Sequence, residues 1–175
     1  MKIIKRKYQP KVSILMTVFD EEKYIFRSLN SLINQSYKKW EAIIVDDFST
    51  DDTAKIIKKL NDKRIKYTKL QKHMGRKFAI NHGLKRCSGK YISILDADDI
   101  YLKNKLEKQI DFLENNKEIK FLASWANVID GEGKRILTYK TPLTYNKIKK
   151  KLLFSNIIGH SSVIYEKNFA RRKKL

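Results

Sequence analysis

The chain has 175 residues, of which 42% are hydrophobic, and this suits one domain with its own core. Its 39 lysines and arginines outnumber 19 acids, and its one cysteine, Cys87, excludes an internal disulfide and is typical of a reducing compartment. The first residues lack the apolar segment of a secretory signal, and no run approaches the roughly 18 apolar residues of a membrane helix. We therefore expect a cytoplasmic protein, soluble or peripherally attached to the inner face of a membrane.

From residue 12 to about residue 115, apolar runs alternate with segments of helical periodicity. Residues 12–18 are rich in β-branched residues, and Ile25, Leu29 and Leu32 then recur at helical spacing. The predicted strands are 12–18, 41–46, 64–70 and 91–95, and the predicted helices are 21–34, 50–61, 77–86 and 103–115. Such continuous apolar strands predict an α/β fold, a mostly parallel Rossmann-type sheet with helices on both faces.

The pattern changes after residue 118, where turn residues become frequent. The predicted elements are a strand over 120–129, a turn over 130–133, a returning hairpin arm over 134–139, a helix over 144–153 and a strand over 157–165. These segments predict a small antiparallel hairpin region in the later half. Because the chain has no repeat, low-complexity segment or Pro/Gly-rich linker, we expect residues 1–175 to form a single domain.

The formal net charge of +20 allows three interpretations. These are a compositional bias without a specific partner, attraction to an anionic membrane surface, and binding to nucleic-acid phosphates. The basic residues are scattered except for the dense run at 171–174, so a compositional bias is favoured and a membrane surface comes second. Nucleic acid is the least favoured partner because no basic stripe interleaved with aromatic residues is present.

Acidic residues gather where the predicted strands end. The second strand ends in Asp46 and Asp47, and Asp96, Asp98 and Asp99 follow the fourth strand in a DXD motif. Ligands of open parallel sheets bind at the carboxyl ends of the strands. Because clustered carboxylates repel one another, they call for a cation, and oxygen ligands suit Mn²⁺ or Mg²⁺ bridging to a diphosphate.

Each acidic cluster also has a purely structural interpretation. The acids after the fourth strand fit a helix N-terminus, and Ser49 with Asp52 fits a capping box. Neither interpretation accounts for Asp46 and Asp47, which precede the cap. A carboxylate at that strand end can accept a hydrogen bond from a nucleotide base, with Phe19 lying against the ring.

Five blocks in order resemble the family-2 glycosyltransferases, which have the GT-A fold. Residues 43–53 look like the family's Val-Asp-Asp-Gly-Ser-Thr-Asp-x-Thr, and 73–83 are similar to Asn-x-Gly-x-x-x-Ala-Arg-Asn-x-Gly. The other blocks are the first strand and nucleotide loop at 12–21, the strand leading into Asp-Ala-Asp-Asp at 91–99, and the His-x-Ser-Val segment at 156–165. Each block alone is a weak signal, but five in this order and spacing are specific.

The resemblance implies an enzyme that transfers a sugar, with inversion, from a nucleoside-diphosphate sugar to a hydroxyl acceptor. The base is commonly uracil, and a glycan or lipid-linked acceptor would place the enzyme in cell-surface polysaccharide or glycoconjugate synthesis. The implied nucleotide site consists of Thr17, Phe19 and Glu21, with the base on Asp47 and phosphate contacts from Arg76 or Lys77. Asp96 and Asp98 would bind the ribose and the metal, with the metal on Asp98 or Asp99. His160 would lie beside the metal or the acceptor. A structural histidine is the competing interpretation of His160.

The chain departs from the family pattern in several places. Phe19 replaces a tyrosine, Phe48 stands where glycine is common, so that a different loop conformation is expected, and Ile80 replaces an arginine. Family members also continue into a helix whose acid is the general base, and no such segment precedes Leu175. We therefore assign no base and expect donor binding with little or no sugar transfer. The alternative is a truncated, non-catalytic nucleotide-binding or partner-binding protein.

Overall fold

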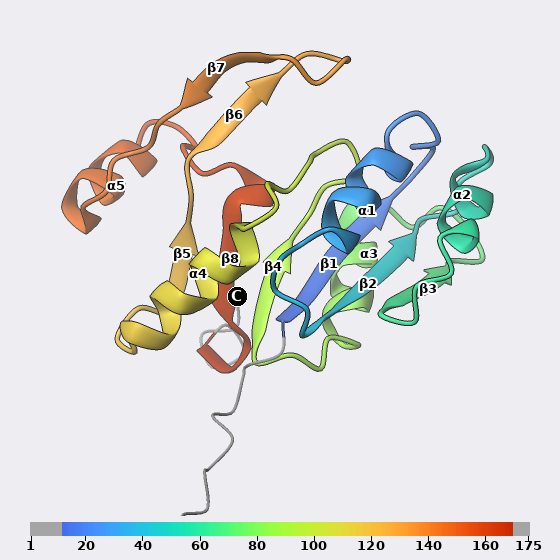
Figure 1. Cartoon of the computed structure of the whole chain (residues 1–175), viewed down its shortest axis with the longest axis horizontal. Coiled ribbons are helices and arrows are strands. Elements are labelled where there is room, and N and C mark those ends of the chain that lie inside the picture. The colour runs from blue at the N-terminus through green and yellow to red at the C-terminus, as the bar shows by residue number, and fades with distance from the viewer. Residues whose placement is uncertain (1–11, 170–175) are drawn as a thin grey trace, which may run out of the picture.

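The computed structural model describes residues 12–169 as an α/β sandwich with a projecting hairpin (Figure 1). The strands are β1 (Val12–Val18), β2 (Trp40–Asp46), β3 (Ile65–Lys69), β4 (Tyr91–Ile94), β5 (Phe121–Ala123), β6 (Ala126–Ile129), β7 (Arg135–Tyr139) and β8 (Val163–Glu166). The helices are α1 (Ile25–Ile33), α2 (Thr53–Lys59), α3 (Arg76–Leu84), α4 (Lys105–Asn115) and α5 (Tyr145–Leu152), with a 3-10 turn at His160–Ser162.

The main sheet has six strands in the order β3-β2-β1-β4-β8-β5. The strands β3, β2, β1 and β4 are parallel, while β8 runs antiparallel to both β4 and β5. Strands β6 and β7 form a separate antiparallel pair. The predicted mostly parallel sheet and the small hairpin region are therefore confirmed.

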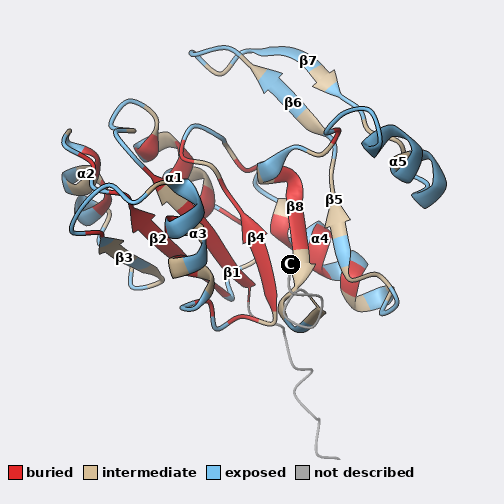
Figure 2. Ribbon diagram, turned by 180° about the vertical axis from the view of Figure 1, so that it is seen from behind, coloured by how far each residue is buried: buried red, intermediate tan, exposed pale blue. Residues whose placement is uncertain are grey.

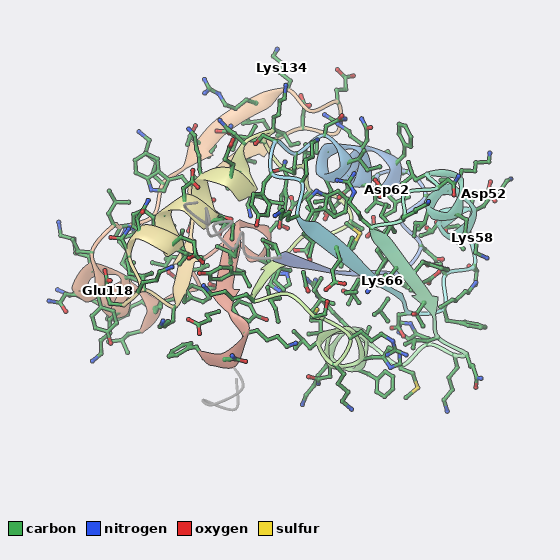
Figure 3. The ribbon with its side chains drawn as sticks, turned by 60° about the horizontal axis from the view of Figure 1, so that its bottom comes forward. Asp52, Lys58, Asp62, Lys66, Glu118 and Lys134 are labelled. Atoms are coloured by element: carbon green, nitrogen blue, oxygen red, sulfur yellow. The ribbon has the colours of Figure 1, made fainter. Side chains whose placement is uncertain are left out.

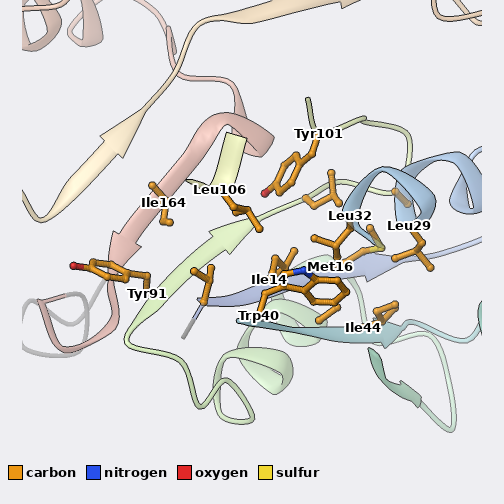
Figure 4. Packing of buried hydrophobic residues seen from close by; sticks show 14 of the residues in the cluster. Ile14, Met16, Leu29, Leu32, Trp40, Ile44, Tyr91, Tyr101, Leu106 and Ile164 are labelled. Atoms are coloured by element: carbon orange, nitrogen blue, oxygen red, sulfur yellow. The ribbon is translucent and has the colours of Figure 1, made fainter. Parts of the chain in front are cut away.

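Alternate residues of the central strands pack against different helices, which explains why these strands are apolar throughout. Ile14 and Met16 of β1 lie in a cluster with Leu29 and Leu106, from α1 and α4 (Figure 4). Leu15, between them, packs on the opposite face with residues of α3 and the loop after it. Both faces are buried in this way (Figure 2), and each buried aliphatic side chain contributes about 1.5–3 kcal/mol to folding.

Helix α3 lies unusually close to the sheet because it presents a glycine there. A Cβ atom built on Gly83 would lie 2.3 Å from Leu15 Cδ1 and 3.1 Å from Val45 Cγ2. Only the absence of a side chain allows this approach. Because α3 begins at Arg76, the position of the helix against the sheet also sets where Arg76, the predicted phosphate contact, lies.

Two predictions for the later half are wrong. Residues 120–129 do not form one strand, because the chain leaves the main sheet at Ser124 and Trp125 and enters the hairpin. The strand predicted over 157–165 begins only at Val163, because a 3-10 turn precedes it, closed by the Ser162 N–H donating to Gly159 O at 3.0 Å. The pairing of β4 and β5 with β8, and of β6 with the neighbouring β7, decides both boundaries.

Charged side chains lie around the outside of the molecule (Figure 3). Arg64 Nη2 pairs locally with Asp62 Oδ2 at 2.6 Å, and Lys66 Nζ lies 2.8 Å from Oε2 of Glu41, which is buried. Within residues 12–169, no helix has the length and apolar character required to cross a bilayer. The basic run at 171–174 lies outside the described residues.

Candidate functional site

The loops after β1 and β2 are tied together at the carboxyl edge of the sheet. The Asp20 N–H donates to Ser49 Oγ at 3.0 Å, and the Thr50 N–H donates back to Asp20 Oδ1 at 2.7 Å. The Glu21 N–H donates to Thr53 Oγ1 at 2.8 Å. These reciprocal bonds make the first two loops one unit at the edge where the acids gather.

The capping box expected from Ser49 and Asp52 is wrong. Helix α2 begins at Thr53 after Asp52, and no side chain caps it. Ser49 instead accepts the hydrogen bond from Asp20, and its own N–H donates to Asp46 Oδ1 at 2.7 Å. Long-range contacts between the two loops thus take the groups that a local cap would use.

Phe48 adopts the conformation that a glycine would favour at its position. Its φ is +76°, in the left-handed region, and Asp20 across the loop has φ of +52°. A residue with a side chain is strained in this region by about 1–2 kcal/mol, and that strain is retained within the loop. The Lys69 ammonium lies 5.6 Å from the Phe48 ring and offsets part of that strain.

Asp47 joins the end of β2 to the start of α3. Its Oδ1 accepts the Met74 N–H at 2.7 Å, its Oδ2 accepts the Gly75 N–H at 2.8 Å, and His73 Nδ1 lies 3.1 Å from Oδ2. Asp47 is buried, whereas His73 is exposed. Because Oδ1 has one partner and keeps a second lone pair, the carboxylate can still accept a bond from a ligand.

His73, which contacts Asp47, also packs against an aromatic ring. The Phe19 ring lies 4.5 Å from the His73 ring with an interplanar angle of 53°, and Phe19 is 45% exposed. Thr17, two residues earlier in β1, is half-buried and pairs with Val45. An exposed aromatic face beside buried hydrogen-bond acceptors is suited to a planar heterocycle. No local pattern in the sequence singles out His73, which stands where the family has an asparagine.

Three predicted residues from distant parts of the chain meet at one carboxylate. Arg76 Nη2 lies 2.7 Å from Asp96 Oδ1, and His160 Nδ1 lies 3.0 and 3.1 Å from the two Asp96 oxygens. The Asp96 N–H also donates to Ser161 Oγ at 2.9 Å. Arg76 Nη2 lies 3.0 Å from His160 Nδ1, so this ring nitrogen serves either the guanidinium or the carboxylate at a given moment.

The cationic neighbours of Asp96 control its protonation. Burial would raise the pKa of Asp96, but the hydrogen bond and charge of His160 and the charge of Arg76 outweigh it and lower the pKa. Asp96 is therefore ionised at neutral pH and is held in one orientation. The 3-10 turn that replaces the predicted strand is what brings His160 to this point.

The other acids of the cluster repel one another. Burial raises the pKa of Asp99, the charges of Asp98 and Asp96 raise it further, and a hydrogen bond from Ser161 opposes them. The pKa of Glu21 is raised by burial and then by Asp98, Asp51 and Asp96. Negative charge thus accumulates around exposed Asp98, and Arg76 and His160 offset it only at Asp96. That is the arrangement in which a divalent cation stabilises carboxylates.

The acids of this cluster fit a cation that takes only some of its ligands from the protein. Within the described part of the chain, no three or more His, Cys, Asp or Glu side chains form a ready ligand set. Magnesium-type sites often use one or two carboxylates and complete their coordination with water and substrate phosphates. Asp98 and Asp99 supply those two carboxylates, exposed and adjacent.

A cavity of about 910 Å³ adjoins residues 96–99, which follow β4 and are called the acidic turn below. Asp98, Asp99 and His160 line it, as do Trp125 from the connection between β5 and β6 and Lys105 from α4. Phe19, Asp47 and Asp96 are not among its lining residues. The acidic turn therefore lies between this cavity and the edge of the sheet where Phe19 and Asp47 are found.

Two further groups in this cavity have chemistry that the sequence did not indicate. Lys105 Nζ lies 2.9 Å from Gln109 Oε1 and 3.3 Å from Ser93 Oγ, and burial lowers its pKa to about 7. Asp130 also lines the cavity, but its Oδ1 accepts the N–H groups of Glu132 and Lys134 at 3.0 and 2.9 Å. Asp130 thus holds the hairpin turn, and we assign no catalytic base.

Comparison with known proteins identifies the fold family. The model of glycosyl transferase family 2 matches residues 13–175. An uncharacterized glycosyltransferase of Methanocaldococcus jannaschii is 36% identical over 171 residues, covering 95% of this chain and 59% of its own length. The Escherichia coli UDP-Glc:alpha-D-GlcNAc-diphosphoundecaprenol beta-1,3-glucosyltransferase is 37% identical over 142 residues, 79% of this chain and 55% of its own.

A solved structure agrees with these matches. Residues 1–349 of Staphylococcus aureus TarS in complex with UDP superpose with a TM-score of 0.75 at 27% identity, over 94% of this chain and 49% of that one. The chain therefore spans roughly half the length of the relatives it matches. The predicted GT-A-like fold is confirmed, and the chain belongs to glycosyl transferase family 2.

Proposed function

We propose that this chain binds the donor of a sugar-transfer reaction, a nucleoside-diphosphate sugar with UDP as its nucleotide. The observation that carries the proposal is the meeting of Arg76, Asp96 and His160 beside the acidic turn. Phe19 and His73 supply ring faces for the base, and Asp47 supplies an acceptor for a base N–H. The UDP in the related TarS structure supports uracil as that base.

The acidic turn would receive the diphosphate end of the donor. We assign Asp96 to the ribose, Asp98 and Asp99 to Mn²⁺ or Mg²⁺, and Arg76 to the phosphates. Thr17 and Glu21 would complete the nucleotide side from β1 and the loop after it. A divalent cation there would neutralise the charge that develops on the departing nucleoside diphosphate.

The acceptor would lie in the cavity on the other side of the turn. A hydroxyl held there would lose its proton to a general base, which we do not assign, and attack the anomeric carbon while the nucleoside diphosphate leaves from the opposite face. This displacement inverts the configuration. His160 lines the cavity and contacts Asp96, so it would lie between the acceptor and donor sites. The names of the relatives support a glycan or lipid-linked acceptor and a role in cell-surface polysaccharide synthesis. We further propose that the protein acts at the inner face of the membrane.

Calorimetric titration tests the donor assignment. UDP, GDP and CDP would each be titrated into the chain in manganese and again in EDTA. We expect UDP to bind selectively in manganese and more weakly in EDTA. Failure of all three nucleotides to bind under both conditions would refute the proposal.

A nucleotide-binding protein without transfer activity is the second candidate. The observation in its favour concerns Asp130. Among the described residues that line the cavity, it is the one carboxylate outside the acidic turn, and its Oδ1 already accepts hydrogen bonds within the hairpin turn. Incubation with UDP-sugars and simple acceptors in manganese separates the two candidates. Release of UDP above the rate without acceptor would show that a base lies within the 175 residues.

A further inference from the structure

Helix α5 and its flanks leave large apolar side chains in water. Leu143 is 79% exposed, Leu153 is 76% exposed and Phe154 is 84% exposed. No residue of α5 is buried. The α5 patch, as used below, consists of these apolar and basic side chains: Leu143, Tyr145, Leu152, Leu153, Phe154, Lys147, Lys149, Lys150 and Lys151.

The lysines of the α5 patch have no opposite charges nearby in the sequence. Residues 143–154 contain four lysines and no Asp or Glu. Among residues 12–169, none of these four lysines forms a salt bridge, whereas Lys90 and Lys117 both pair with Glu114 of α4. The positive charge of α5 is therefore uncompensated within the described fold.

The patch is also ordered by the helix into two faces. Tyr145, Ile148 and Leu152 follow one another at spacings of three and four residues and share one side of α5. Lys147 and Lys150 fall on the opposite side, and Lys151 lies at its flank. A short helix with apolar and cationic sides, flanked by further exposed leucines and a phenylalanine, has the character of an interfacial helix.

We propose that the α5 patch docks on an anionic lipid surface. Covering the patch with another protein segment would bury four ammonium groups that require partners, which costs free energy unless each is paired. At a membrane, the leucines and Phe154 enter the acyl boundary while the lysines remain among anionic headgroups. One occupant thus satisfies both the exposed apolar area and the uncompensated charge.

The position of the patch fits the route of a lipid-linked acceptor, a part of the inference that rests on the proposed function. The hairpin that lines the cavity, through residues such as Tyr139, leads directly into α5. Figure 1 shows β6, β7 and α5 together, projecting beyond the main sheet. A surface-bound α5 would hold the cavity close to the bilayer, where a polyisoprenoid-linked sugar presents its hydroxyl groups.

Vesicle sedimentation tests the proposal with the full chain. Vesicles of phosphatidylcholine alone would be compared with vesicles containing phosphatidylglycerol, at low and high salt. We expect binding only to the anionic vesicles and weaker binding at high salt. Lys150→Gln/Lys151→Gln should lower the partition coefficient by about 25-fold, from roughly five-fold per lysine.

Two matched variants separate the patch from charge in general. Lys58→Gln/Lys59→Gln changes two exposed lysines of α2, which lies at the opposite end of the molecule in Figure 1, and should have little effect. Leu153→Ser/Phe154→Ser leaves the charge intact and should still weaken binding at least ten-fold, because the apolar insertion is lost.

Three outcomes would overturn the proposal. The first is that anionic vesicles do not bind the chain, and the second is that Leu153→Ser/Phe154→Ser binds them as well as the parent chain. The third is that Lys173→Gln/Lys174→Gln, in the basic run outside the described residues, has a larger effect than the α5 pair. Titration of UDP into the same variants keeps this test distinct from the donor assignment, since their nucleotide affinity should equal that of the parent.

Discussion

Residues 12–115 and the segment that follows them differ in how they are packed. All seven residues of β2 are buried, whereas α5 has no buried residue. In the first part, helices cover both faces of the sheet and hydrogen bonds join neighbouring loops. In the second, the hairpin touches α1 chiefly through Arg27 Nη2, which donates to Glu132 O at 3.0 Å. Residues 12–115, called the proposed donor half below, are thus packed around the sheet, whereas the later segment exposes apolar and basic side chains.

The largest expected effect is on the acidic turn of the donor half. Asp98→Ala should weaken UDP binding in manganese by about 100-fold, near 2.7 kcal/mol, because an exposed cation ligand is lost while the core is untouched. Calorimetry measures the affinity, and circular dichroism should show an unchanged fold. Asp111→Ala, at an exposed position on α4, is the matched control. Equal UDP affinity in both variants would contradict the metal assignment.

Phe19 tests the ring-lined side of the same half. Phe19→Ala should weaken UDP binding by about 1–3 kcal/mol because the exposed ring offers a stacking face for the base. Since stacking does not involve the cation, the loss should be similar in manganese and in EDTA. Phe26→Ala, which removes an exposed ring from α1, should leave the affinity unchanged. A loss confined to manganese would place Phe19 at the phosphates instead.

A pair of glycines compares the packing of the two halves directly. Gly83→Ala should destabilise the chain by about 1–2 kcal/mol, because overpacking against Leu15 exceeds the gain in helix propensity. At Gly131, in the hairpin turn, an added Cβ meets no atom within 4 Å, so Gly131→Ala should change stability by less than about 0.5 kcal/mol. Urea denaturation measures both. Similar losses would show that the hairpin is packed as tightly as the sheet.

The sequence predicts the donor half better than the segment after it, for a physical reason. Buried parallel strands are encoded locally by apolar runs, so β1, β2 and β4 appear within a residue of their predicted limits. The break at Ser124 and Trp125 depends on pairing with distant strands, which no local pattern records. The same holds for the site, since the acids after β4 were found by their position, while His73 and Lys105 acquire their significance only from tertiary neighbours.

The smallest expected effect concerns repulsion within the acidic turn. The folded-state pKa of Asp99 is raised by burial and by Asp98 and Asp96, so ionised Asp99 opposes folding at neutral pH. That cost is absent below the unfolded-state pKa near about 4 and develops as the pH rises through the folded-state value. Asp99→Asn should therefore raise the melting temperature in EDTA at pH 7 by about one or two degrees and leave it unchanged near pH 3.5.

A cation should reverse the sign of this effect. With manganese and UDP present at pH 7, ligand binding through ionised Asp99 should raise the melting temperature of the parent, and it should raise that of the Asp99→Asn variant less. Thermal melts of both proteins, with and without manganese and UDP, measure the crossover. A stabilisation by Asp99→Asn that persists at full strength with both ligands would mean that Asp99 repels its neighbours without holding the cation. The donor half would then rely on Asp98 as its metal ligand from the acidic turn.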